Sequence, residues 1–132
     1  MKRQAVIPEA FRAAAEALDL SPGILSRDHL FLTGTTGSGP EGEMPEDEET
    51  QFRHAFEKIG LVLAAAGVGM DAVVEMTSYH VGLRGHFDLF DKLRREVFDS
   101  PTPAWTAVEV AGLRREGAVV EIRIVACTAT QV

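Results

Sequence analysis

The sequence predicts an α+β fold in which two main helices pack on one face of a mixed β-sheet. Segments with helical periodicity alternate with short β-branched segments along the 132 residues. No internal repeat and no linker divides the chain, so we expect a single domain over residues 1–132. Hydrophobic residues form 45% of the chain and charged residues 25%, which is ordinary for a globular protein.

The first third of the chain predicts a short strand, a helix and a second strand. Residues 4–7 form an apolar stretch that ends at Pro8. Residues 8–18 start with this proline, are rich in alanine and place their apolar residues on one helical face. The apolar segment 29–33 runs into glycines, which favours a strand.

The two main helices are predicted in the middle of the chain. In residues 47–66, apolar side chains recur at steps of three and four, and acidic residues crowd the first turn, where the helix dipole favours negative charge. Residues 86–98 show a second apolar stripe and precede two prolines. The segment 72–81 between the helices is rich in β-branched residues and predicts a strand.

Two strands are expected at the C-terminal end, over residues 104–111 and 118–128. The polar segment 112–117 separates them, which favours a hairpin. Alternation in the last strand sets Glu121 and Arg123 among aliphatic neighbours on one face. A sheet with helices on one face leaves its other face uncovered, so we expect the chain to self-associate.

Charge and hydropathy exclude several classes of function. The 13 basic and 20 acidic residues give a net charge of −7, which disfavours binding to nucleic acid. No apolar run approaches the roughly 18 residues that span a bilayer, so no membrane association is expected. The N-terminus has no apolar signal region and the single cysteine, Cys127, cannot form an internal disulfide; both features favour a cytoplasmic location.

Sequence motifs for cofactors and metals fail in their context. Residues 37–42 satisfy G-x-G-x-x-G, but no helix opens on Gly42 and acidic residues follow, so we expect a mobile surface loop instead of a nucleotide site. The acidic run lacks the alternating ligands of a calcium loop. The four histidines show no H-E-x-x-H or H-x-H pairing. We therefore expect no metal and no cofactor.

The carboxylate of Glu121 has two interpretations at this stage. Glu121 and Arg123 could form an exposed charge pair that contributes a few tenths of a kcal/mol. Alternatively, Glu121 could face a shared cleft, where partial burial would suit it to acid–base chemistry. Alternation alone leaves both open.

Three stretches of the chain carry a family resemblance. LSPGILSRDHLFLTG (residues 20–34), PAWTAVEVAGL (103–113) and GAVVEIRIVA (117–126) resemble the Rid/YjgF family of reactive-intermediate imine and enamine deaminases, whose members are also labelled endoribonuclease L-PSP. The resemblance implies a chorismate-mutase-like fold and a homotrimer that binds small molecules in clefts between its subunits.

The resemblance also implies site residues. In deaminating members, an arginine before the AVEV strand binds the carboxylate of a 2-imino acid, and a glutamate of the V-E-I strand positions the attacking water. Glu121 matches that glutamate, as the catalytic residue. Thr33 and Gly34 match a Ser-Gly pair that lines the pocket.

Three positions depart from the family pattern. Trp105 stands where the arginine is expected, and an indole offers one N–H donor and no charge. Asp91 replaces an asparagine of the second helix, and Leu20 replaces a tyrosine near the cleft. Arg123 or Arg84 could supply a guanidinium in place of the missing one.

Two classes of function follow. The chain is either a divergent Rid/YjgF hydrolase that acts on a small imine, enamine or related carbonyl compound, or a non-catalytic trimer that binds a small metabolite or a protein partner. The first class uses Glu121 to orient water and Trp105 to wall the cleft. Ribonuclease activity, which the family label suggests, is disfavoured by the net charge of −7.

Overall fold

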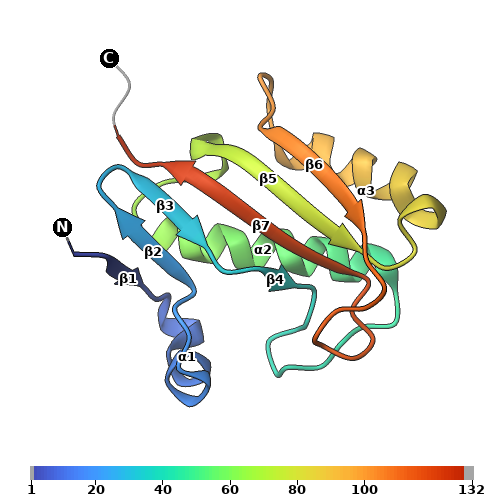
Figure 1. The fold of residues 1–132 in the computed structure, drawn as a ribbon, viewed down its shortest axis with the longest axis horizontal. Coiled ribbons are helices and arrows are strands. Elements are labelled where there is room, and N and C mark those ends of the chain that lie inside the picture. The colour runs from blue at the N-terminus through green and yellow to red at the C-terminus, as the bar shows by residue number, and fades with distance from the viewer. Residues whose placement is uncertain (1, 130–132) are drawn as a thin grey trace.

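A computed structural model describes residues 2–129, which form one β-sheet and the helices that pack against it (Figure 1). The strands are β1 (Gln4–Val6), β2 (Gly23–Ser26), β3 (His29–Leu32), β4 (Thr35–Thr36), β5 (Val73–His80), β6 (Ala104–Glu109) and β7 (Val120–Cys127). The α-helices are α1 (Arg12–Leu18), α2 (Glu48–Ala65) and α3 (Leu83–Val97), with 3-10 turns at Glu9–Phe11 and Met70–Ala72.

The sheet is mixed, in the order β1-β2-β3-β7-β5-β6, and β4 also pairs with β7. β5 and β6 are parallel, while the other neighbours are antiparallel. Figure 1 shows α2 and α3 behind the sheet, on the same face. This arrangement confirms the predicted α+β fold with two main helices on one face. No helix within residues 2–129 is long and apolar enough to cross a membrane.

The predicted C-terminal hairpin is wrong. β6 and β7 are not neighbours, because β5 lies between them and pairs with both. β6 runs parallel to β5 after the α3 crossover, and residues 110–119 then carry the chain past β5 to its other edge. A tight turn was not required here, since a connection of this length can step over a strand.

Two strands and one helix boundary also differ from expectation. β2 and β4 were not predicted, because four and two residues carry too little periodicity to be recognised. β2 joins β3 through a tight turn in which Arg27 adopts a φ of 56°. α3 begins at Leu83, three residues before the predicted start at His86, directly after the left-handed Gly82.

The hydrophobic core lies between the sheet and the two long helices. Alternation in β7 is confirmed: Val120, Ile122 and Ile124 are fully buried against the helices, while Glu121 and Arg123 are half-buried on the other face. We call this second face of the sheet the open face. The largest fully buried side chains outside β7 are Phe52, Phe90, Leu30, Ile59, Leu63 and Met76.

The segment predicted to be a surface loop is buried over residues 37–39. A Cβ atom added to Gly37 would overlap the backbone of Gln51, so the chain passes α2 at a distance that only glycine permits. The expectation of an exposed loop was wrong here because the first glycine serves helix packing.

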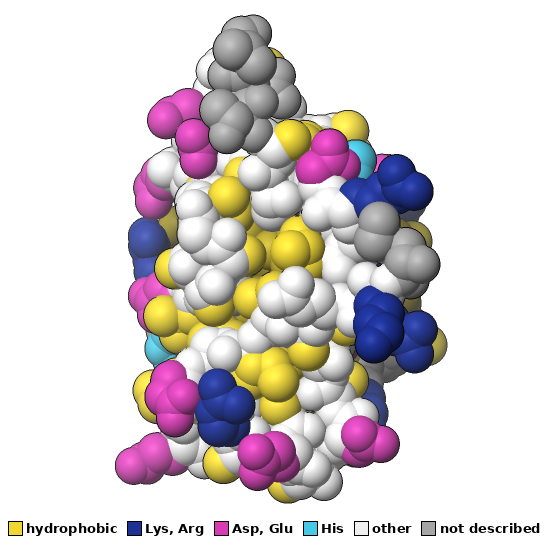
Figure 2. Space-filling view, turned by 90° about the vertical axis from the view of Figure 1, so that its left-hand side faces the viewer, with side chains coloured by type: hydrophobic (Ala, Val, Ile, Leu, Met, Phe, Trp, Pro, Cys, Tyr) yellow, Lys and Arg dark blue, Asp and Glu magenta, His cyan; other side chains and the backbone are white. Residues whose placement is uncertain are grey.

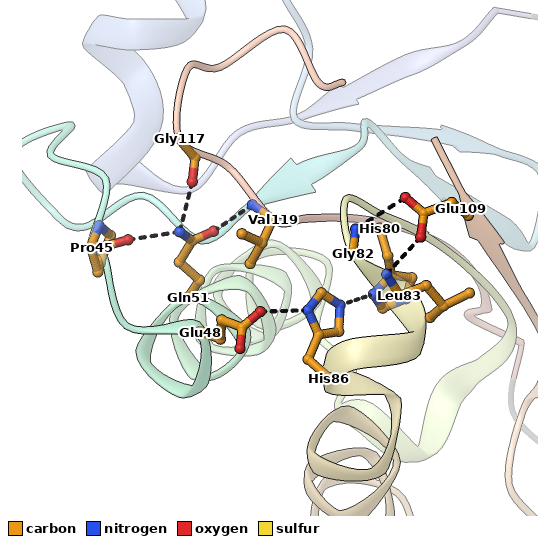
Figure 3. A network of polar contacts seen from close by, with 10 residues as sticks. All are labelled: Pro45, Glu48, Gln51, His80, Gly82, Leu83, His86, Glu109, Gly117 and Val119. Atoms are coloured by element: carbon orange, nitrogen blue, oxygen red, sulfur yellow. Dashed lines mark hydrogen bonds and ion pairs between the residues drawn. The ribbon is translucent and has the colours of Figure 1, made fainter. Parts of the chain in front are cut away.

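Gln51 fixes α2 to two other segments (Figure 3). Its buried side-chain amide donates to the carbonyls of Pro45 and Gly117 at 2.7 and 2.9 Å, and its oxygen accepts from the Val119 N–H at 2.9 Å. Every polar group of the amide that lies in the core therefore has a partner, which is the condition for burying it without penalty.

Replacing Gly37 by alanine should destabilise the protein by about 3 kcal/mol or more, because the methyl group cannot be accommodated without moving α2. Gly60→Ala is the matched control: Gly60 lies in α2 with nothing within 4 Å of its would-be Cβ. That variant should gain up to about 1 kcal/mol from helix propensity. Urea unfolding of both variants measures these changes, and equal stabilities would contradict the close packing at Gly37.

Candidate functional site

Glu121 lies on the open face, beside the backbone of Gly34. β4 pairs with β7 and brings Thr36 opposite Glu121. A Cβ atom at Gly34 would overlap the Glu121 carboxylate, so the absence of a side chain at residue 34 makes room for that carboxylate. None of the ion pairs within residues 2–129 involves Glu121. The half-buried carboxylate is therefore free to accept a hydrogen bond from a ligand or a water molecule.

Thr33 and Leu20 lie at the same end of the molecule as Gly34. The Thr33 hydroxyl donates to the carbonyl of Ser21 at 2.6 Å, and its backbone N–H donates to the carbonyl of Pro22 at 3.0 Å. These bonds hold the segment before Gly34 against the loop that follows α1. Leu20 precedes Ser21 in that loop and is 46% exposed.

Arg123 shares the open face with Glu121, two residues further along β7. Side chains with this spacing lie about 7 Å apart on one face. No ion pair joins the two side chains, and no hydrogen bond of the described residues uses the Arg123 guanidinium. Both residues are half-buried, so the exposed charge pair considered from the sequence does not form.

Trp105 lies on the opposite face of the sheet from Glu121. In the parallel pair, Trp105 is opposite the buried Met76, whereas Glu121 is opposite Tyr79 on the other face of β5. The indole stacks on Phe87 of α3, with ring centroids 5.7 Å apart and planes 5° apart. Its N–H donates to the hydroxyl of Ser78 at 2.8 Å. The indole thus joins the edge strand β6 to α3.

Asp91 lies near Trp105 through a contact with Arg94. The Arg94 guanidinium lies 4.4 Å from the centroid of the Trp105 ring, a cation–π distance. The same guanidinium donates through Nε, at 3.1 Å, and Nη2 to the Asp91 carboxylate. The hydrogen bond from Arg94, with its charge and that of Arg95, lowers the pKa of Asp91. Sequence reasoning missed Arg94, which is the arginine that contacts Trp105.

Arg84, the other arginine considered from the sequence, lies in the exposed first turn of α3. The Glu109 carboxylate accepts there from the N–H groups of Gly82, at 3.0 Å, and Leu83, at 2.7 Å (Figure 3). These hydrogen bonds lower the pKa of Glu109, because they favour its charged form.

The structure therefore divides the sequence-predicted residues into two groups. Thr33, Gly34, Glu121 and Arg123 belong to the segment before β4 and to the open face of β7. Trp105 and Asp91 lie on the helix-covered face, at the outer edge formed by β6 and α3. Within one chain, the sheet separates the two groups.

A buried cluster of histidines was also missed. His80 of β5 and His86 of α3 are almost fully buried, and their rings are joined by a 3.0 Å contact between Nδ1 of His80 and Nε2 of His86. Burial, together with the neighbouring His86 and against an opposing effect of Glu109, lowers the pKa of His80 to about 4. No group of three His, Cys, Asp or Glu residues in the described part of the chain could hold a metal ion.

Comparison with known proteins gives a consistent result. The sequence profile of the family described as Endoribonuclease L-PSP matches residues 11–128. The chain is 34% identical over 127 residues to RutC family protein YjgH of Escherichia coli, a match that covers 96% of this chain and 95% of that protein.

Solved structures show the same similarity. A structure of protein YJGH superposes with a TM-score of 0.89 at 33% identity, over 99% of this chain and 100% of that one. RidA from an Antarctic Psychrobacter gives a TM-score of 0.77 at 29% identity, over 81% of this chain and 86% of that one. This chain belongs to the Rid/YjgF/L-PSP family.

Proposed function

We propose that the protein hydrolyses the C=N bond of a small imine or enamine in clefts between the subunits of a homotrimer. The observation that carries this proposal is the Glu121 carboxylate, which is half-buried, unpaired among the described residues, and accommodated by the missing side chain of Gly34. A carboxylate held in this way is available to orient a water molecule.

The chemistry needs one carboxylate and one water. Glu121 accepts a hydrogen bond from water and takes its proton as the water oxygen attacks the carbon of the protonated imine, which gives a carbinolamine. Returning that proton to the nitrogen makes ammonia the leaving group, and the C–N bond breaks as the carbonyl forms and Glu121 takes the hydroxyl proton. Imine and water thus give a ketone or aldehyde and ammonia, without a metal or a redox cofactor.

Arg123 is the guanidinium that we assign to an anionic substrate. It shares the face and strand of Glu121, and no carboxylate of the described residues pairs with it. Arg94 is less suitable, because Asp91 already occupies its donors and its exposed fraction is only 12%. A guanidinium matches a carboxylate through two parallel hydrogen bonds, so Arg123 would select 2-imino acids over uncharged imines.

Self-association is supported by the composition of the surface. Phe31 of β3 and Val108 of β6 are 39% and 37% exposed, which leaves apolar side chains on the sheet without cover in one chain. Figure 2 shows hydrophobic side chains gathered along the middle of the surface at the β1–β3 end, with charged side chains toward its margins. A second copy that covers the open face would also lie over Glu121 and Arg123, which share that face.

A second function, binding without catalysis, is favoured by Trp105. The indole N–H is engaged by Ser78 and the ring by α3, so residue 105 offers nothing to a substrate carboxylate. A trimer of this kind would bind a small metabolite or a protein partner. The net charge of −7 disfavours RNA as substrate or ligand in either case.

Glu121→Gln should lower kcat for ammonia release by about 100-fold or more, because the amide keeps the shape of the side chain but cannot take a proton. Imines are generated in situ by an amino-acid oxidase or an amine oxidase, and ammonia is measured with and without the protein. Glu75→Gln is the control, since Glu75 is an exposed carboxylate on the same face. If the wild-type protein accelerates ammonia release from neither the carboxylated imines of the amino-acid oxidase nor the uncharged imines of the amine oxidase, the proposal is overturned in favour of binding without catalysis.

Arg123→Gln should raise KM for a carboxylated imine by about tenfold or more, the cost of a hydrogen bond to a charged group. KM for an uncharged imine should stay unchanged, so the ratio of the two KM values isolates the carboxylate contact. Arg84→Gln is the matched control, because Arg84 lies in the exposed first turn of α3. A shift with Arg84→Gln and none with Arg123→Gln would show that the assignment of the guanidinium is wrong.

A further inference from the structure

Four contacts connect Trp105 at the edge of the sheet to Glu48 at the start of α2. The Trp105 N–H donates to the Ser78 hydroxyl at 2.8 Å, and that hydroxyl lies 2.7 Å from Nε2 of His80. Nδ1 of His80 lies 3.0 Å from Nε2 of His86, and Nδ1 of His86 lies 2.7 Å from the Glu48 carboxylate. Figure 3 shows the inner part of this row, in which Glu48, His86 and His80 follow one another.

The two end groups of this row determine the direction in which its hydrogen bonds are donated. An indole N–H can only donate, and an ionised carboxylate can only accept. Between them lie one hydroxyl and two imidazoles, so with neutral histidines four protons are available for four contacts. Every contact holds one proton only if both His80 and His86 carry theirs on Nδ1.

The middle of the row is buried, so a polar atom in it that lacks a hydrogen-bond partner would destabilise the protein. Ser78 and His80 are 0% exposed and His86 is 3% exposed, so water cannot replace a missing partner there. Glu48, whose side chain is 45% exposed, is the contact with solvent.

The charged groups that face His80 come from each element packed around it. His86 belongs to α3, Glu48 reaches the row from α2, and Glu109 of β6 favours the protonated form of His80. On the side of β7, His80 is opposite Val120, which carries no charge. Burial and the neighbouring His86 outweigh the opposing effect of Glu109, and the pKa of His80 lies at about 4.

We propose that Trp105, Ser78, His80, His86 and Glu48 form a one-proton switch, in which protonation of the buried histidine pair is coupled to the hydrogen bond that holds the Trp105 indole. One added proton makes five protons for four contacts. With His80 doubly protonated, its Nδ1–H still donates to Nε2 of His86, and its Nε2–H now points at the Ser78 hydroxyl. The Ser78 oxygen receives two donors, and its own O–H has no acceptor left in the row.

The switch acts on the edge of the sheet. Ser78 is the hydrogen-bond partner of the indole, and the indole in turn packs on Phe87 and beneath Arg94. A change at Ser78 therefore alters the packing of α3 against β6. This inference concerns protonation and stands or fails independently of the proposed hydrolysis.

The proton positions are tested first, on the unaltered protein, by nitrogen-15 NMR of histidine-labelled chain at pH 7.5. His80 and His86 should both be neutral with the proton on Nδ1, which is the one of the four tautomer combinations that places one proton in every contact. The signals of His80 and His86 are distinguished from those of the two remaining histidines, His29 and His54, which lie outside the row. A proton on Nε2 of either His80 or His86 would overturn the proposal.

The coupling is tested through fluorescence, because Trp105 is the only tryptophan in the chain. Emission should change in a single step centred near pH 4, where His80 takes its proton. Glu48→Gln should move this midpoint down by about one pH unit or more, because it removes the negative charge that stabilises an added proton on the histidine pair. Glu49→Gln is the matched control, since the neighbouring Glu49 pairs with Arg53 outside the row and should leave the midpoint unchanged.

Far-UV circular dichroism at each pH separates the switch from unfolding. The unfolded chain binds the His80 proton near pH 6.5 and the native protein near pH 4, so the free energy of unfolding falls as the pH decreases between these values. Ser78→Ala removes the link between the indole and the histidines and should abolish the emission step while the protein is still folded. An emission step that survives this substitution, or a midpoint that is equal in both glutamate variants, would show that the indole is not coupled to the histidines.

Discussion

The alternation of side chains across the central strand β7 is the constraint on which the rest of the structure depends. One row of β7 is buried under α2 and α3 and forms the floor of the core, while the other row carries Glu121 and Arg123 on the open face. A shift of one residue would bury both charges and expose the core, so the register is strongly specified. Because β5 pairs with β7 and β6 pairs with β5, this register also decides which face Trp105 occupies.

Local sequence patterns predicted the individual helices and strands better than they predicted which strands lie side by side. The long helix α2 and the two faces of β7 follow from periodicity, which depends only on residues close in sequence. The position of β5 between β6 and β7 depends on pairing between distant segments, and turn-like residues near 112–117 suggested a hairpin instead. Gly37 was misread for the same reason: its role is set by the backbone of Gln51, which no local pattern contains.

The candidate site shows the same difference between what local sequence patterns predict and what contacts between distant segments decide. The family resemblance located Glu121 and Gly34, and the structure places one against the other. The side of Trp105 could not be predicted, because β6 is an edge strand whose two faces are both partly exposed and therefore lack a clear apolar row. Arg94 and the His80–His86 pair escaped notice because a strand and a helix contribute to each contact across a turn, and single-segment motifs do not describe that geometry.

Residue 105 has a structural role in this chain. The indole is held on its polar edge by Ser78, on one side by Phe87, and near its face by Arg94, which Asp91 neutralises. The Ser78 hydroxyl is also a member of the histidine row. An arginine at residue 105 would therefore have to donate to Ser78 from a different direction, and its positive charge would need a partner within the packed contact with α3. An arginine at residue 105 therefore requires more than one substitution. Within one chain, the sheet separates residue 105 from Glu121 and Arg123, which lie on the other face.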